Sequence, residues 1–262
     1  MARIITAAVL APVFIYITWF APVTAFMAMI EIICGICFIE YAGMAAQKGI
    51  GVFRLRGLFA ALIIPIAFLS ASSVVFMVMA LVFGSLALSS LTDTKTGVER
   101  LIFTMFGIVY VGLAYSAPML VRTQPDGEKL FLLICCSTWG ADIGAYYTGR
   151  AVGRTKLAPD ISPNKTVEGF VGGIVFSVLS GWLFAHFFFP ASAMLMIAGA
   201  GLIGGLIGPI GDLVESMMKR HFGVKDSGTI LPGHGGFLDR TDALMLTIPF
   251  FYVFLALIGG LA

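Results

Sequence analysis

The stretch from residue 192 to residue 261 alternates apolar and polar sequence in a way that decides the fold class. It reads SAMLMIAGAGLIGGLIGPI over 192–210, GDLVE, then SMMKRHFGVKDSGTILPGHGGFLDRTD over 216–242, and finally ALMLTIPFFYVFLALIGGL. Each apolar run has close to the roughly 20 residues that an α-helix needs to cross a hydrocarbon core. The polar stretch between them combines five Gly with Asp, Lys, Arg and His. Such charge beside lipid-spanning helices is costly unless it lines a watery site.

The composition of the whole chain indicates an integral membrane protein. Of its 262 residues 59% are hydrophobic and only 11% are charged, and the mean hydropathy is +1.01. A soluble domain has about 25% charged residues. The apolar spans are 4–21, 23–44, 57–71, 73–91, 101–121, 129–149, 168–189, 192–210 and 240–261. We therefore predict an all-α, polytopic membrane helix bundle with about nine transmembrane helices; a weak boundary between the third and fourth spans leaves eight as the alternative.

The basic residues predict which side of the membrane each connection faces. With the N-terminus inside, the inner segments hold fourteen Lys and Arg residues, whereas the outer segments hold only Arg122 and Lys129. An excess of this kind is typical of cytoplasmic loops. We expect a cytoplasmic N-terminus and an outside C-terminus. The 216–242 stretch then faces the cytoplasm, where nucleotides are found.

The chain divides into two predicted parts. Residues 1–121 form N-terminal transmembrane helices with five spans, and residues 122–262 form C-terminal catalytic transmembrane helices. The second part carries two long cytoplasmic connections, 150–167 and 211–239, whereas the outer connections are short. This asymmetry indicates that one face carries the function, because binding residues concentrate in loops held by a rigid scaffold.

The eighth span carries two helical signals. Its glycines recur four residues apart between Gly201 and Gly208, a spacing that lets membrane helices approach closely. Beyond that span, Asp212, Ser216 and Lys219 stand at positions i, i+4 and i+7. A continuing helix would place these three side chains on one face.

Three polar segments are expected to converge on the cytoplasmic side. They are WGADIGAYYTGR (139–150), ISPNKTVEG (161–169) and the 216–242 stretch. Their residue types match what a nucleoside triphosphate needs, which is Mg²⁺, cationic side chains and backbone N–H donors. Two acids of the second span, Glu31 and Glu40, lie outside these segments and have no assigned role.

Individual residues can be assigned to this chemistry. Asp212 and Asp239 are the predicted catalytic Mg²⁺ ligands, because magnesium typically takes one or two carboxylates plus phosphate and water. Asp142, an acid inside an apolar span, is an additional metal candidate. Lys219 is the predicted catalytic cation for phosphate charge, and the glycine-rich segment 232–237 lets backbone approach a phosphate closely. The remaining nucleotide- or phosphate-binding candidates are Arg150, Ser162, Lys165, Arg220, Lys225, His234, Gly235 and Arg240.

The order of polar residues in the 216–242 stretch is specific. It runs Ser216-x2-Lys219-Arg220-x4-Lys225-Asp226-x-Gly228-x2-Leu231-Pro232-x-His234-Gly235-Gly236-Phe237-x-Asp239-Arg240-Thr241-Asp242. This pattern resembles the signature of the phosphatidate cytidylyltransferases, also called CDP-diacylglycerol synthases. Upstream residues are similar too: Trp139, Asp142, Ala145, Tyr146, Gly149, Arg150 and the run from Ser162 to Gly169. Ile143 departs from the family, which commonly has Thr or Ser there, and the first 120 residues resemble it only as apolar spans.

The resemblance implies a defined reaction. CTP and phosphatidic acid would give CDP-diacylglycerol and pyrophosphate for phospholipid biosynthesis, with Mg²⁺ at Asp212 and Asp239 and room for K⁺ as a second ion. The implied partners are CTP, phosphatidic acid and membrane lipids, with no nucleic acid. The implied location is a bacterial-type inner (cell) membrane, with the active site facing the cytoplasm. Glycine-rich spans often pair, so a homodimer is a further expectation.

Two other functions compete with this reading. A CTP-dependent polyprenol or lipid kinase would use the same nucleotide but release CDP in place of pyrophosphate. A membrane transporter would use intramembrane acids to gate a solute, and it typically shows inverted repeats and broken helices, which are not evident in this sequence. No Walker A loop or kinase-type glycine loop occurs either.

Overall fold

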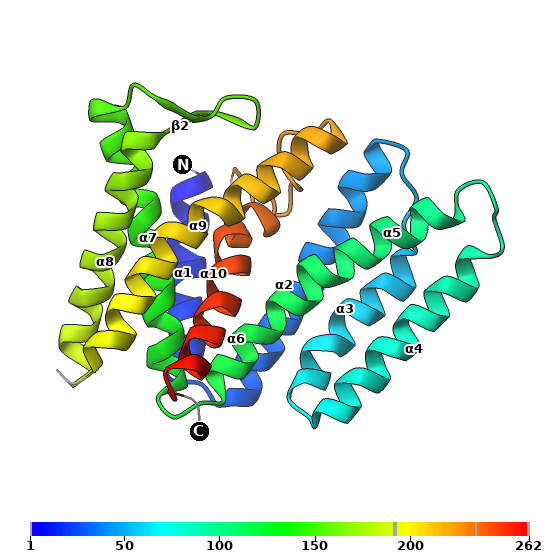
Figure 1. Ribbon diagram of the computed structural model, residues 1–262, viewed down its shortest axis with the longest axis horizontal. Helices are drawn as coiled ribbons and strands as arrows, with labels where there is room; N and C mark the ends of the chain where they lie inside the picture. The colour runs from blue at the N-terminus through cyan, green and yellow to red at the C-terminus, as the bar shows by residue number, and fades with distance from the viewer. Residues whose placement is uncertain (1, 191–192, 234, 261–262) are drawn as a thin grey trace. The chain divides into compact units, whose positions relative to one another are not determined.

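The computed structural model describes residues 2–190, 193–233 and 235–260, with side chains from residue 8 onward. Its first helices and strands are α1 (Ala2–Trp19), α2 (Val23–Gln47), α3 (Arg54–Phe68), α4 (Ser72–Ser90), α5 (Gly97–Gly107), the π-helical segment η1 (Ile108–Leu113) and α6 (Ala114–Arg122). There follow α7 (Gly127–Val152), β1 (Lys156–Ala158), β2 (Ser162–Thr166), α8 (Val167–Phe188), α9 (Met194–Phe222) and α10 (Leu238–Leu257) (Figure 1). Helices therefore dominate the chain, as predicted.

The prediction of a polytopic membrane protein is confirmed at this level. Within the described residues, seven helical stretches are long and apolar enough to cross a membrane. They are α2, α4, the continuous stretch Gly97–Arg122, α7, α8, α9 and α10. The 15 residues of α3 and the apolar Ala8–Trp19 part of α1 are shorter. The total of nine spans and the side on which each terminus lies stay predictions.

The packing of the chain separates two compact units. The first comprises Met1–Leu120 and Lys219–Arg240, and the second comprises Val121–Met218 and Thr241–Ala262. The chain passes between them at residue 120, within α9 and within α10. The residues of the predicted site therefore belong to two different units.

In the first unit, α3 packs against α2, α4 and η1. Small residues permit this close packing: a Cβ added at Gly112 would lie 3.0 Å from the Cα of Ala61. The hydroxyl of Tyr41 donates a hydrogen bond to the carbonyl of Phe103 at 2.7 Å. The ring of Phe222 is buried and lies 5.9 Å from that of Tyr41, centroid to centroid. The end of α9 is thus anchored on α2.

In the second unit, α7, α8 and α9 lie side by side (Figure 1). A Cβ added at Gly201 or Gly205 would lie 2.7 Å from a backbone Cα of α8, so only glycine allows the two helices to come this close. The hydroxyl of Ser177 on α8 lies within 2.8 Å of the Ser137 carbonyl on α7 and 2.7 Å of the Gly201 carbonyl. The predicted close packing of the glycine-rich span is confirmed.

The two long connections contain more regular structure than the sequence predicted. The 150–167 connection holds an antiparallel hairpin of β1 and β2, and the Thr166 hydroxyl at its end accepts the N–H of Gly169 to cap α8. In the 211–239 connection, α9 continues as far as Phe222, and α10 begins at Leu238. This agrees with the predicted continuation of a helix through Asp212, Ser216 and Lys219, and the helix ends just before Gly223, which adopts φ +74°.

Candidate active site

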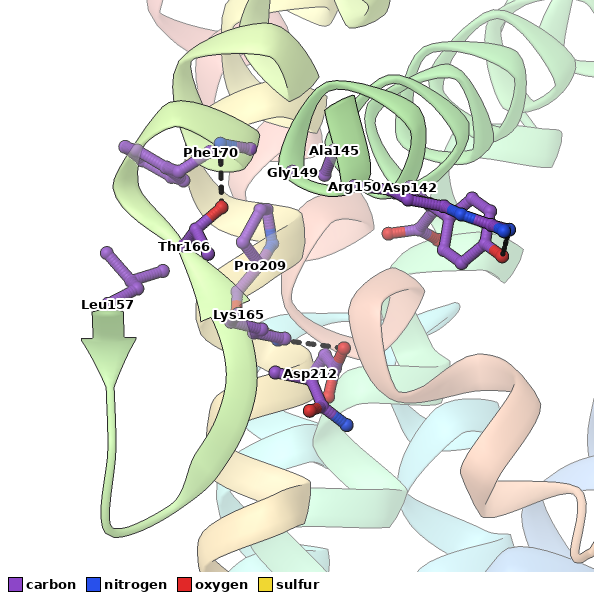
Figure 2. A pocket seen from close by; sticks show the side chains of 13 residues that line it. Asp142, Ala145, Gly149, Arg150, Leu157, Lys165, Thr166, Phe170, Pro209 and Asp212 are labelled. Atoms are coloured by element: carbon purple, nitrogen blue, oxygen red, sulfur yellow. Dashed lines mark hydrogen bonds and ion pairs between the residues drawn. The ribbon is translucent and has the colours of Figure 1, made fainter. Parts of the chain in front are cut away.

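A pocket of about 490 Å³ lies in the second unit between α7, the β1–β2 hairpin with the start of α8, and α9. Three segments that are far apart in the sequence line it (Figure 2). Helix α7 contributes Asp142 and Arg150, strand β2 contributes Lys165, and α9 contributes Pro209 and Asp212. These polar residues were predicted from the sequence to converge, and in the structure they line one pocket.

An ion pair between β2 and α9 occupies this pocket. The ammonium Nζ of Lys165 lies 2.8 Å from Oδ2 of Asp212 and also donates to the carbonyl of Pro209 at 3.3 Å. Oδ1 of Asp212 accepts a hydrogen bond from the Ser216 hydroxyl at 3.1 Å. The helix predicted to carry Asp212, Ser216 and Lys219 includes all three residues, and this contact confirms that Asp212 and Ser216 share one of its faces. The Asp212 side chain remains 35% exposed, so a ligand can still reach it.

The α7 wall of the pocket adds a cation and an acid. The guanidinium of Arg150 donates to the hydroxyl of Tyr146 at 3.2 Å, and both side chains are exposed. Asp142 is exposed as well, and it lines the same pocket as the Lys165–Asp212 pair, from α7 (Figure 2). Ile143, the residue that departs from the family pattern, is 54% exposed and is not part of the described lining.

The first unit contains a second acidic centre around Asp239, in the first turn of α10. Lys219 Nζ lies 2.6 Å from Asp239 Oδ1, and this pair is well buried. Oδ2 of Asp239 accepts from the Ser227 N–H, the Ser227 hydroxyl and the Gly236 N–H, each at 2.9 Å. Lys219 therefore pairs with a predicted metal ligand, a contact that the sequence did not indicate.

An acid without an assigned role completes this centre. Glu40 on α2 is 5% exposed and accepts the backbone N–H groups of Phe237 and Leu238 at 3.1 and 2.9 Å. The hydroxyl of Ser227 lies 3.2 Å from its Oε2. The only sequence signal for this role was an acid near the end of an apolar span, which is a functional-site indicator.

The other predicted residues are placed as follows. Gly235 adopts φ +80°, and a Cβ there would lie 2.7 Å from Oδ2 of Asp239, so glycine is required for the close approach. Ser162 is half-buried in β2 and lies opposite Ala158, outside the described pocket lining. Exposed positions are occupied by Arg220, Lys225 and Arg240. His234 lies outside the described residues.

The carboxylates fit magnesium in their donor chemistry. A carboxylate offers about two acceptor positions on each of its two oxygens. Asp212 uses one on each oxygen, whereas Asp239 uses three on Oδ2 and one on Oδ1. Among the described residues no cluster of three or more His, Cys, Asp or Glu could hold a metal. Magnesium needs only one or two carboxylates when phosphate and water supply the rest.

Comparison with known proteins gives a consistent family. The chain is 43% identical over 159 residues to a phosphatidate cytidylyltransferase of Bacillus subtilis (strain 168), which covers 59% of this chain and 58% of that protein. It is 44% identical over 153 residues to the protein of the same name from Staphylococcus saprophyticus, with 58% of each covered. The chain thus spans less than two thirds of the length of these relatives.

The family model extends further along the chain than these alignments. The Cytidylyltransferase family model matches residues 1–258. This range includes the N-terminal helices, for which the sequence showed only apolar spans. The chain belongs to the cytidylyltransferase family.

Proposed function

We propose that the protein is a phosphatidate cytidylyltransferase, which converts CTP and phosphatidic acid into CDP-diacylglycerol and pyrophosphate. Family membership supports this activity, and so do relatives that carry that name. The observation that carries the proposal is the Lys165–Asp212 ion pair in a pocket that also holds Arg150 and Asp142. Cations and acids in one pocket of a membrane protein match a substrate with phosphates and a bound divalent cation.

The proposed reaction takes place directly between the two substrates and needs no covalent intermediate on the protein. A phosphate oxygen of phosphatidic acid attacks the α-phosphorus of CTP, and the bond from that phosphorus to the pyrophosphate oxygen breaks. The lipid phosphate is already ionised near neutral pH, so no strong base is needed. Positioning and charge neutralisation carry the catalysis. Lys165 and Arg150 are the proposed cations for the phosphates, with Lys165 held in place by Asp212.

Asp212 and Asp239 are the proposed magnesium ligands. When bound, Mg²⁺ supplies positive charge that stabilises the leaving pyrophosphate. Asp212 offers acceptor positions on both oxygens, and Asp239 offers its remaining position on Oδ1. That these two acids share one ion stays a prediction, as do a third ligand at Asp142 and a second, potassium ion.

The substrate explains why this chemistry takes place at a membrane. Transferring acyl chains into water costs about 0.8 kcal/mol per CH₂, so phosphatidic acid reacts while it remains in the bilayer. We place the pocket at the level of the inner headgroups of a bacterial inner membrane, facing the cytoplasm, with nine spans and a cytoplasmic N-terminus. The excess of Lys and Arg in the predicted inner connections supports this orientation. A homodimer stays a prediction.

The test is product analysis with the purified protein. CTP labelled in the cytosine ring, phosphatidic acid and Mg²⁺ should give a labelled lipid and an equal amount of pyrophosphate. A lipid kinase would release CDP and leave the cytosine label in water. A transporter would form neither product. Each alternative therefore has its own outcome.

A further inference from the structure

The turn that precedes α10 is built around the buried carboxylate of Glu40. Oε1 of Glu40 accepts the N–H of Phe237, and Oε2 accepts the N–H of Leu238. These amides belong to the start of α10, where backbone N–H groups have no partner inside the helix. Glu40 comes from α2, nearly 200 residues earlier in the chain, and all these atoms lie in the first unit. One N-terminal helix thus caps the helix that carries Asp239.

The backbone around Glu40 is shaped to the same carboxylate. A Cβ at Gly228 would lie 2.7 Å from Oε1 of Glu40, and a Cβ at Gly236 would lie 2.5 Å from Oε2. Real Cβ contacts are essentially never this short, so any larger residue would displace the backbone or the carboxylate. Gly228 and Gly236 therefore allow the backbone to contact the Glu40 carboxylate directly.

Ser227 connects the Glu40 carboxylate to the Asp239 carboxylate. Its hydroxyl lies 3.2 Å from Oε2 of Glu40 and 2.9 Å from Oδ2 of Asp239, and its N–H donates to the same Asp239 oxygen. A hydroxyl has one proton, so the two carboxylates share a single donor. The position of Asp239 is consequently tied to the segment that Glu40 holds, through Ser227 and through the adjoining Leu238.

We infer that Glu40 is a positioning residue: it holds Ser227, Phe237 and Leu238 and thereby fixes the Asp239 carboxylate for the reaction. The inference deepens the proposed function and rests on it. It gives the N-terminal helices a part in the chemistry, although Glu40 itself is not assigned any contact with substrate or metal.

The first arm of the test compares Glu40→Gln with Glu31→Gln, the same change in the same helix at an acid that the site does not use. Backbone amide exchange is followed in the protein without added metal or nucleotide, in peptides that resolve Phe237 and Leu238. We expect slow exchange of these amides in the unaltered protein. Exchange should accelerate about tenfold in Glu40→Gln, as for the loss of one charge-assisted hydrogen bond, and stay unchanged in Glu31→Gln.

The second arm separates positioning from stability. Glu40→Gln should lower kcat by about tenfold or more, while the KM for CTP changes by less than about threefold and the folded fraction keeps its melting temperature within a few degrees. The Mg²⁺ concentration for half-maximal rate should rise. A residue with a purely structural role would lower the melting temperature but leave the kcat of the folded fraction intact.

A second variant keeps the inference open to refutation if Glu40→Gln fails to fold. Gly228→Ala keeps every charge but intrudes on Oε1 of Glu40, whereas Gly43→Ala on α2 meets open space and serves as its control. Gly228→Ala should reproduce the faster exchange and the lower kcat.

Three results would overturn the inference: fast exchange of Phe237 and Leu238 in the unaltered protein, unchanged exchange or an unchanged kcat in folded Glu40→Gln, or unchanged exchange in Gly228→Ala. If the unaltered protein makes no CDP-lipid, the proposed function fails by itself, and the exchange arm still decides whether Glu40 holds the turn.

Discussion

The two acidic centres of the molecule differ in how much of each carboxylate is left for a ligand. Asp212 in the second unit is 35% exposed and has one ammonium and one hydroxyl as partners. Asp239 in the first unit is 6% exposed and has an ammonium, two backbone amides and a hydroxyl. Asp212 is therefore accessible to a ligand and can change its hydrogen-bond partners, whereas the Asp239 carboxylate is already fixed by the protein before any ligand binds.

The largest effect is expected at the rigid centre. Asp239→Asn removes the charge opposite Lys219 and turns an amide N–H toward backbone donors. CDP-lipid formation should fall by at least about a hundredfold, since a lost electrostatic contact of this type costs that much in catalysis. Breaking a buried ion pair also costs about 3–5 kcal/mol, so the melting temperature should drop while the protein still folds. Near-normal turnover in the folded fraction would remove Asp239 from the site.

Asp212→Asn should lower activity to a similar degree but leave stability almost unchanged. Its pair with Lys165 is partly exposed, and such pairs are worth at most about 1 kcal/mol. Melting temperatures and turnover are measured side by side with Asp239→Asn. Equal loss of stability in the two variants would contradict the distinction between an open and a rigid centre.

A smaller effect is expected at Lys165. Lys165→Met keeps most of the length of the side chain but removes the ammonium that faces Asp212. The KM for CTP should rise by about tenfold, as for one lost charge-assisted contact to phosphate. Thermal stability should stay within a degree or two. An unchanged KM for both CTP and phosphatidic acid would take Lys165 out of substrate binding.

The smallest effect is expected at Ile143, where the family commonly has Thr or Ser. This side chain is exposed and not part of the described pocket lining. Ile143→Thr should therefore keep kcat and KM within about twofold, because it touches none of the paired groups. A larger change in either constant would show that the pocket extends to this face of α7.

Much of the helical framework could be predicted from the sequence, because long apolar runs and glycines four residues apart leave few other structures. The Asp212–Ser216 contact followed from helical spacing alone. The Glu40 contacts and the Lys219–Asp239 pair could not be predicted in this way. These contacts join segments that are far apart in the chain, and the periodicity of the sequence does not predict contacts of this kind. Tertiary packing determines which buried acid accepts hydrogen bonds from which donors.

Local turn structure was also hard to predict. The β1–β2 hairpin is short, its strand β2 contains a proline, and it has no alternating apolar pattern. Helix α9 continues through Asp212, Ser216 and Lys219, as their spacing predicted, but the sequence did not indicate where it ends, because charged residues are good helix formers. The actual end is set by backbone conformation at Gly223.

The central claim is most directly tested by following both products of labelled CTP with the purified protein in bilayers that contain phosphatidic acid. Labelled CDP-diacylglycerol and pyrophosphate should form in equal amounts, only when Mg²⁺ is present, and both should be almost completely lost in Asp239→Asn. Release of CDP with a newly phosphorylated lipid, or the same rate after chelation of all divalent cations, would contradict it.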